Sequence, residues 1–307
     1  MDRFAISATG LSINYMPQYV AEELGYFEEQ GIELSSYVPD PWTICLKDMN
    51  AGRSESVLGG VWVPLVYLRN GGGYREFAKM SSRCPFALVS RKPLEKEFSW
   101  KDLEGKVVLS PGSNSIGPSV LIAGAAEEAG ADDTKIRIVH DFYLDMLEEL
   151  FIGGWGDYVC TKSESAAMME MKGQGYVATY MTESAGPCPW SVYYATQETL
   201  NREDDLCGRF TLALQKGYNW LRSHDGYACR EILAKRWPKV DARIGQDVVD
   251  MFLRTGMWPE TCDLTHEELH RWELMLMSKN HLLPEEIPYE ELVDSRPFLY
   301  AKEKLGM

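Results

Sequence analysis

The spacing of apolar residues predicts alternating strands and helices from the first residues onward. Phe4–Ala8 is a short apolar run typical of a strand, and helical spacing then predicts a helix from about Tyr15 to Gln30, which Gly31 ends. Ile32–Val38 reads as the next strand, followed by a helix to about Asn50 and a strand near residues 57–61. This β-α-β-α-β order predicts a parallel sheet with right-handed crossovers.

The same alternation continues between residues 87 and 180 and predicts a second sheet. Trp190–Ala195 then reads as a strand that returns to the first sheet, and the remaining patterns are mainly helical. We therefore predict an α/β protein of two lobes, one made of residues 1–84 plus 190–307 and the other of residues 85–189. The two crossings between the lobes are expected near residues 82–86 and 184–190, and the C-terminal helices are additional to the sheets.

Several local motifs resemble one family over most of the chain. The run Tyr19–Leu34 is similar to its opening helix and strand, Ala51-Gly52 with Gly59-Gly60 to its third strand, and Trp100–Val108 to its entry into the second lobe. These motifs resemble the periplasmic-binding-protein type 2 fold, in the group that holds nitrate/sulfonate-binding proteins and thiamine-pyrimidine synthases. The resemblance implies a "Venus flytrap" with parallel-rich sheets and a ligand in the cleft between the lobes.

The family that the motifs resemble includes importer binding proteins and also enzymes. Its pyrimidine synthases carry a cysteine cluster that this chain lacks. The nucleophilic cysteine of its sulfinate desulfinase would fall near Ser12, where this chain has no cysteine. Neither chemistry therefore carries over to this chain residue by residue.

Composition narrows the classes of partner. The 31 Lys and Arg stand against 46 Asp and Glu, a formal charge of −15, which argues against nucleic acid and against anionic membrane surfaces. No segment approaches the roughly 18–20 apolar residues that span a bilayer, so no membrane insertion is expected. The seven scattered cysteines and a beginning without a signal-peptide pattern favour a cytoplasmic protein, or a periplasmic or extracellular one if a signal was removed.

The ends of the predicted strands supply the candidate ligand-binding residues, because ligands of open α/β sheets bind outside the carboxyl ends of the strands. Small and polar loops suit contacts to a ligand, and a Ser-Asn-Ser turn before a helix suits an anion. Tryptophans after a strand or at a crossing suit a flat aromatic or heterocyclic ring. On these grounds the candidates are Thr9, Gly10, Ser12, Trp42, Gly60, Trp62, Ser113, Asn114, Ser115 and Trp190.

Four charged or reactive residues are further candidates. Arg83 at the first crossing could pair with a carboxylate, and Glu164, next to Lys162, follows a predicted strand of the second lobe. His140 ends another strand and could bind the ligand or move a proton, and Cys188 could act as a nucleophile or acid. Each also has a structural interpretation: a solvated arginine, a histidine bonded at a strand end, or a buried inert thiol.

The run His266-Glu267-Glu268-Leu269-His270 matches the H-E-x-x-H zinc signature. Thr265 before it reads as an N-cap, and no third ligand is evident in the sequence. We interpret the run as the start of an amphipathic helix, and we expect neither a metal site nor a cofactor.

These observations leave three functions open, all with a small-molecule partner. The one favoured is an intracellular enzyme of lyase or decarboxylase type that acts on a carboxylated aromatic or heterocyclic substrate, with His140 and Cys188 as candidate catalytic residues. The alternatives are the substrate-binding protein of an ABC importer for a small organic anion, and a cytosolic ligand sensor without chemistry. The sequence leaves the oligomeric state open.

Overall fold

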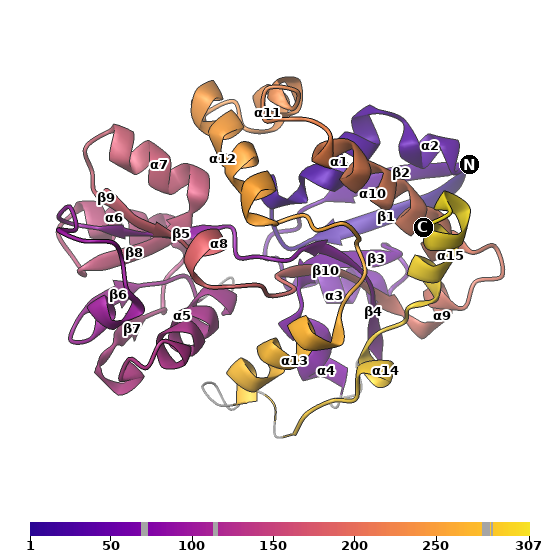
Figure 1. Cartoon of the computed structure of the whole chain (residues 1–307). Helices are drawn as coiled ribbons and strands as arrows, with labels where there is room; N and C mark the ends of the chain where they lie inside the picture. The colour runs from indigo at the N-terminus through magenta and orange to yellow at the C-terminus, as the bar shows by residue number, and fades with distance from the viewer. Residues whose placement is uncertain (69–72, 113–115, 278–282, 284) are drawn as a thin grey trace.

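The computed structural model describes residues 1–68, 73–112, 116–277, 283 and 285–307. Its named strands form two five-stranded sheets, and Figure 1 shows these sheets side by side in an elongated molecule. Strands β5 to β9 lie on the left of the view and β1 to β4 with β10 on the right. No helix in the described part of the chain combines the length and apolarity needed to cross a membrane.

The first sheet has the strand order β2-β1-β3-β10-β4. Strand β1 pairs in parallel with β2 and β3, as the early β-α-β-α-β pattern predicts, whereas the returning strand β10 is antiparallel to β3 and β4. The strands of this sheet are Asp2–Ala8 (β1), Ile32–Tyr37 (β2), Ser56–Gly60 (β3), Tyr74–Ser81 (β4) and Ser191–Thr196 (β10).

The second sheet has the order β7-β6-β8-β5-β9. Strand β6 is parallel to β7 and β8, and β5 is antiparallel to β8 and β9. We call the parts built on the two sheets the first and the second lobe; their residue boundaries stay a prediction. The strands of the second sheet are Phe86–Ser90 (β5), Val107–Leu109 (β6), Arg137–Val139 (β7), Tyr158–Lys162 (β8) and Tyr176–Tyr180 (β9).

The chain passes between the sheets twice, from β4 to β5 and from β9 through helix α8 (Met181–Ser184) to β10. The crossings run beside each other, because the Cys188 N–H donates to the Ser82 carbonyl at 2.8 Å and the Trp190 N–H to the Ser81 carbonyl at 2.9 Å. The predicted two-lobed α/β fold is confirmed.

The first predicted helix is interrupted in the structure. A short 3₁₀ turn, Ile13–Tyr15 (η1), leads into α1 (Met16–Glu23), and α2 (Tyr26–Glu29) follows as a separate turn. Gly25 between them has a φ of 72°, a left-handed conformation that glycine adopts without the steric cost of a Cβ. The prediction of one continuous helix to Gln30 was therefore wrong.

The helices that the chain adds around the first lobe come mostly from its C-terminal third (Figure 1). The last two, α14 and α15, were not predicted. The helices of the first lobe and the C-terminal segment are α3 (Ile44–Asn50), α4 (Trp62–Leu68), α9 (Gln197–Leu200), α10 (Leu206–Arg222), α11 (Arg230–Arg236), α12 (Ala242–Thr255), α13 (His266–Met275), α14 (Tyr289–Leu292) and α15 (Arg296–Leu305). Those of the second lobe are η2 (Trp100–Leu103), α5 (Gly117–Glu128), η3 (Asp133–Lys135), α6 (Leu144–Ile152) and α7 (Ser163–Met171).

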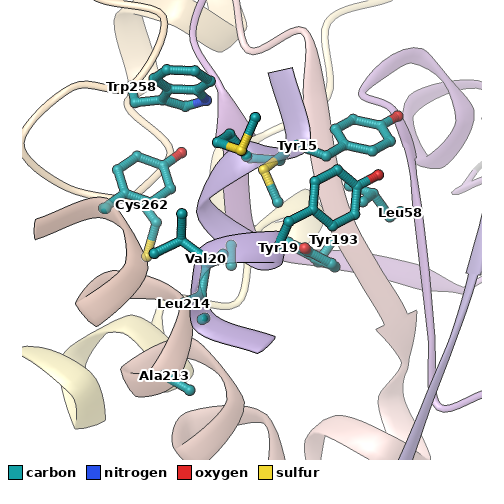
Figure 2. Packing of buried hydrophobic residues seen from close by; sticks show 14 of the residues in the cluster. Tyr15, Tyr19, Val20, Leu58, Tyr193, Ala213, Leu214, Trp258 and Cys262 are labelled. Carbon is teal, nitrogen blue, oxygen red and sulfur yellow. The ribbon is translucent and has the colours of Figure 1, made fainter. Parts of the chain in front are cut away.

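The core of the first lobe anchors the segment that follows β1. Figure 2 shows Tyr19 and Val20 of α1 packed among the buried side chains of β10 and α10, including Tyr193 and Leu214. Burial of such side chains stabilises each by about 1.5–3 kcal/mol, so α1 is held firmly on the sheet. The chain from β1 into α1 therefore has a fixed position at the end of the sheet.

Candidate functional site

A cavity of about 150 Å³ lies between the lobes. Its walls come from the loop after β1, the starts of α4 and α5, the first residues of β5 and β10, the end of β8, and α13. These positions are largely the carboxyl ends of parallel strands, where ligands of open α/β sheets bind. The lining residues are Thr9, Gly10, Leu11, Ser12, Asn14, Tyr15, Trp42, Gly60, Trp62, Val63, Pro85, Phe86, Pro111, Gly117, Leu144, Lys162, Trp190, Ser191 and Trp272.

Aromatic rings make two contiguous walls of this cleft. Trp42 and Trp62 meet edge to face with ring centroids 5.9 Å apart. Trp190 contacts Phe86 with centroids 5.8 Å apart and Trp272 with centroids 6.0 Å apart. Such walls offer wide apolar faces and few charges, which suits a flat ring.

Two glycines make room for the indoles. A Cβ on Gly60 would lie 2.7 Å from the ring of Trp62, and a Cβ on Gly117 would lie 3.0 Å from the ring of Trp190. The first distance is too short for real atoms, so a larger residue at position 60 would displace the indole. Glycine at the end of β3 is thus tied to the placement of Trp62 in the cleft.

The polar floor of the cleft belongs to the first lobe. Tyr15 lies beside Ser191 and Thr9, and burial raises the pKa of its phenol, which therefore stays neutral at ordinary pH. Asn14 Nδ2 donates to Ser81 Oγ at 2.8 Å, and Trp258 Nε1 donates to the Asn14 carbonyl at 2.9 Å. These bonds hold the floor in one arrangement without using charge.

Asn14 has one further polar atom beside the cavity. Its Oδ1 is buried and has no hydrogen-bond partner in the part of the chain that the structure describes. A buried carbonyl oxygen without a donor is destabilising, so a rotation of the Asn14 side chain that turned Oδ1 toward the cavity would favour a ligand or water with an N–H or O–H group there.

Lys162 is the one Lys, Arg, His, Asp or Glu among the described lining residues. It ends β8 in the second lobe, and its Nζ donates to the Leu11 carbonyl of the first lobe at 2.9 Å. This bond joins the lobes across the cleft. Lys162 is partly exposed, and an ammonium group has three donors, so Nζ can bond a further acceptor besides the Leu11 carbonyl.

The structure brings most of the predicted ligand-binding residues to this cleft. Thr9, Gly10, Ser12, Trp42, Gly60, Trp62 and Trp190 all line it. Ser113, Asn114 and Ser115 lie outside the described residues.

The structure places the other candidates elsewhere. Arg83 donates to the Thr182 carbonyl at 3.0 Å and thereby ties the two crossings together. His140 is exposed on the second lobe, where its carbonyl packs against Gly112. Glu164 is buried at the start of α7, and desolvation raises its pKa.

Cys188 is not among the described lining residues and is fully buried. Burial raises the pKa of its thiol to about 12, so the nucleophilic thiolate is scarce at neutral pH. All seven cysteines are free and buried, as is usual for structural thiols.

Asn14, Tyr15, Phe86 and Trp272 line the cleft but were not among the predicted residues. The first three adjoin predicted positions, since Asn14 and Tyr15 follow Ser12 and Phe86 is the last residue of the expected first crossing. Trp272 had no comparable signal, because it reaches the cleft from α13, far along the chain from the strand-end loops of both sheets.

The two lobes and the cleft between them define a periplasmic-binding-protein fold. The profile of the NMT1/THI5-like family matches residues 12–228, and the chain belongs to this family. The chain is 25% identical over 289 residues to a protein of Bacillus subtilis (strain 168) named "Putative binding protein YtlA", covering 92% of this chain and 85% of that protein.

Two solved structures show the same fold. The periplasmic aliphatic sulphonate binding protein SsuA from Escherichia coli has a TM-score of 0.73 at 15% identity, over 96% of this chain and 92% of its own. The desulfurization enzyme DSZB has a TM-score of 0.66 at 14% identity, over 99% of this chain and 100% of its own. At these identities the likeness extends to the fold, which both binding proteins and an enzyme use.

Proposed function

We propose that the protein is a solute-binding protein that captures a small aromatic or heterocyclic anion in the cleft and presents it to an ABC importer. The observation that carries this proposal is the composition of the cleft: tryptophan and phenylalanine walls, a neutral polar floor, and one cation, Lys162. The rings suit a flat molecule, and the lysine suits a carboxylate or sulfonate on it.

The size of the cleft limits the ligand further. About 150 Å³ accommodates a single ring with small substituents and leaves little room for more. An N–H or amino group on the ring would satisfy Asn14 Oδ1. A nitrogen-containing ring with one acidic group therefore fits the walls, the floor and the cation together.

Binding is favoured over the lyase reaction because the described lining residues include no histidine, cysteine, aspartate or glutamate. Proton transfer at neutral pH needs a group that titrates near that pH and reaches the substrate. Lys162 and Tyr15 are the titratable lining groups, and burial pushes the pKa of Tyr15 further from neutrality. The names of YtlA and SsuA support binding as well.

We also propose that the protein acts outside the cytoplasmic membrane. The support is that the Escherichia coli protein SsuA, which shares the fold, is periplasmic. It replaces the cytoplasmic location that we favoured from the sequence.

The test is a screen of the full chain against aromatic and heterocyclic carboxylates and sulfonates, with aliphatic acids of similar size as controls. Thermal shift reports binding, and mass spectrometry of the same mixtures reports any product. Stabilisation by flat acids with unchanged ligand mass is the expected result. Product formation would instead support an enzyme of lyase type. Stabilisation by aliphatic acids alone would contradict the proposal that the ligand is aromatic.

A further inference from the structure

A second hollow lies away from the cleft, between α13 and the chain that leads into α14. Its volume is about 350 Å³. Two histidines one turn apart on α13, His266 and His270, line it, together with Glu273 on the same helix. Glu286 and Glu290 face them from the other side.

Three of these side chains converge on one point. His270, Glu273 and Glu286 each offer a metal-ligand atom, and the three atoms lie within 4.8 Å of one another. His270 and Glu273 are three residues apart, which places them side by side on the helix surface. Glu286 comes from a different segment, so the fold rather than the helix alone assembles the group.

The state of Glu273 indicates that something is missing from this group. The residue is 2% exposed, and its Oε1 is buried with no hydrogen-bond partner among the described residues. His270 Nδ1 and Glu286 Oε1 lie 2.6 Å apart and satisfy each other, which leaves the buried oxygen of Glu273 unmatched. A buried carboxylate oxygen without a partner is costly, and a cation between the three side chains would remove that cost.

We propose that His270, Glu273 and Glu286 bind a divalent transition-metal cation, with Zn²⁺ as the best match to one imidazole and two carboxylates. Zinc binds histidine nitrogen and carboxylate oxygen at about 2.0–2.2 Å, so neighbouring ligand atoms in a tetrahedral site lie about 3.3 Å apart. The existing group reaches this geometry if the His270–Glu286 contact opens and Glu273 moves inward. His270 and Glu286 are both exposed and can turn.

This site differs from the arrangement that H-E-x-x-H predicts. In that arrangement His266 and His270 share the metal and Glu267 serves as a base. Here the ring of His266 stacks on Tyr289 with centroids 3.8 Å apart, and Glu267 is exposed and does not line the hollow. The two ligands that the sequence does not reveal are Glu273 and Glu286, and the position suits a structural metal rather than a hydrolytic one.

The metal would act on the helix that completes the cleft. α13 carries Trp272, which lines the cleft, and Arg271, whose Nη2 donates to the Ala185 carbonyl at the second crossing at 2.7 Å. Joining α13 to Glu286 would hold the helix against the segment before α14. The cation therefore serves as a clamp on the C-terminal wall of the ligand site, at a distance from the ligand.

The experiment titrates Zn²⁺ alone into the full chain, freed of metal with EDTA, by calorimetry, and follows the melting temperature in parallel. The expected result is one Zn²⁺ per chain and a raised melting temperature. His270→Ala and Glu286→Gln change exposed side chains, so both should fold; each is expected to weaken zinc binding about tenfold or more. Glu267→Gln is the matched control and is expected to leave the affinity unchanged.

Two results would overturn the proposal. One is the absence of saturable zinc binding to the unaltered chain. The other is binding that survives His270→Ala and Glu286→Gln, or that Glu267→Gln abolishes, since either would place the metal elsewhere. None of these readouts uses a cleft ligand, so the zinc site and the proposed solute-binding function fail independently.

Discussion

The two sides of the cleft are built differently. The first lobe supplies the polar floor, with Asn14 held by buried hydrogen bonds and Tyr15 buried beside it, and the wall of Trp42 and Trp62. The second lobe supplies mainly apolar surface, from residues such as Pro85, Phe86 and Leu144, and Lys162, the one charged side chain among the lining residues that the structure describes.

This difference assigns separate tasks to the lobes. A side that is already hydrogen-bonded and packed can recognise a ligand without reorganising, and a preorganised site loses less free energy on binding. The bond from Lys162 to the Leu11 carbonyl forms only when the two lobes are close, so the second lobe can stabilise the closed state. We therefore expect changes on the first lobe to alter which ligand binds, and changes on the second to alter closure.

The largest effect is expected from Trp62→Ala. Removing the indole deletes a stacking surface worth about 1–3 kcal/mol, which corresponds to an affinity loss of about tenfold to a hundredfold. Calorimetry with an aromatic ligand from the screen measures it. The matched control is Trp155→Ala, because Trp155 is 68% exposed and lies outside the cleft. Equal effects of the two changes would show that Trp62 does not contact the ligand.

Lys162→Met is expected to have the next largest effect and a different signature. It removes the bond to the Leu11 carbonyl and the one charged lining group, so anionic ligands should bind about tenfold more weakly while neutral rings lose less. Small-angle scattering should also show a more open ligand-free molecule. Lys172→Met, at an exposed position after α7, is the control. Unchanged scattering together with unchanged anion affinity would contradict the inference that Lys162 on the second lobe controls closure.

Gly60→Ala should have a smaller effect that depends on Trp62. The new Cβ would meet the indole at 2.7 Å and shift it, and we expect a loss of a few-fold in affinity. In a background that already carries Trp62→Ala, the same change should cost nothing more, because its target is gone. A double-mutant cycle measures this coupling, and additive losses would show that Gly60 acts through something other than the indole.

The smallest effect is expected from His140→Ala. His140 is exposed and outside the described cleft lining, so ligand affinity should stay within about twofold of the unaltered chain. Binding measurements on the two proteins check this. A large loss would return His140 to the list of ligand-binding residues.

The sequence predicted the fold better than the site, for a physical reason. Hydrophobic alternation and glycine positions are local signals, and they revealed the strands and the return of the chain near Trp190. Strand ends then led to Thr9, Ser12, Trp42 and Trp62, because the rule that places ligands there depends only on topology.

The remaining site residues depend on packing between distant segments. Trp272 reaches the cleft from α13 because Trp190 and the second crossing lie against that helix, which no local pattern encodes. The same holds for Glu286 beside His270. His140 shows the limit of the strand-end rule: it follows β7, as a ligand-binding residue would, yet it is exposed and is not among the described lining residues of the cleft.

The central claim is that the cleft selects a flat, anionic ring. Calorimetry on the full chain with two carboxylates of equal size, one on an aromatic nitrogen-containing ring and one on the saturated ring, tests it most directly. The account predicts that the aromatic acid binds about tenfold or more tightly and that Trp62→Ala removes most of this preference. Equal affinity for the two acids, or a preference that persists without the indole, would contradict it.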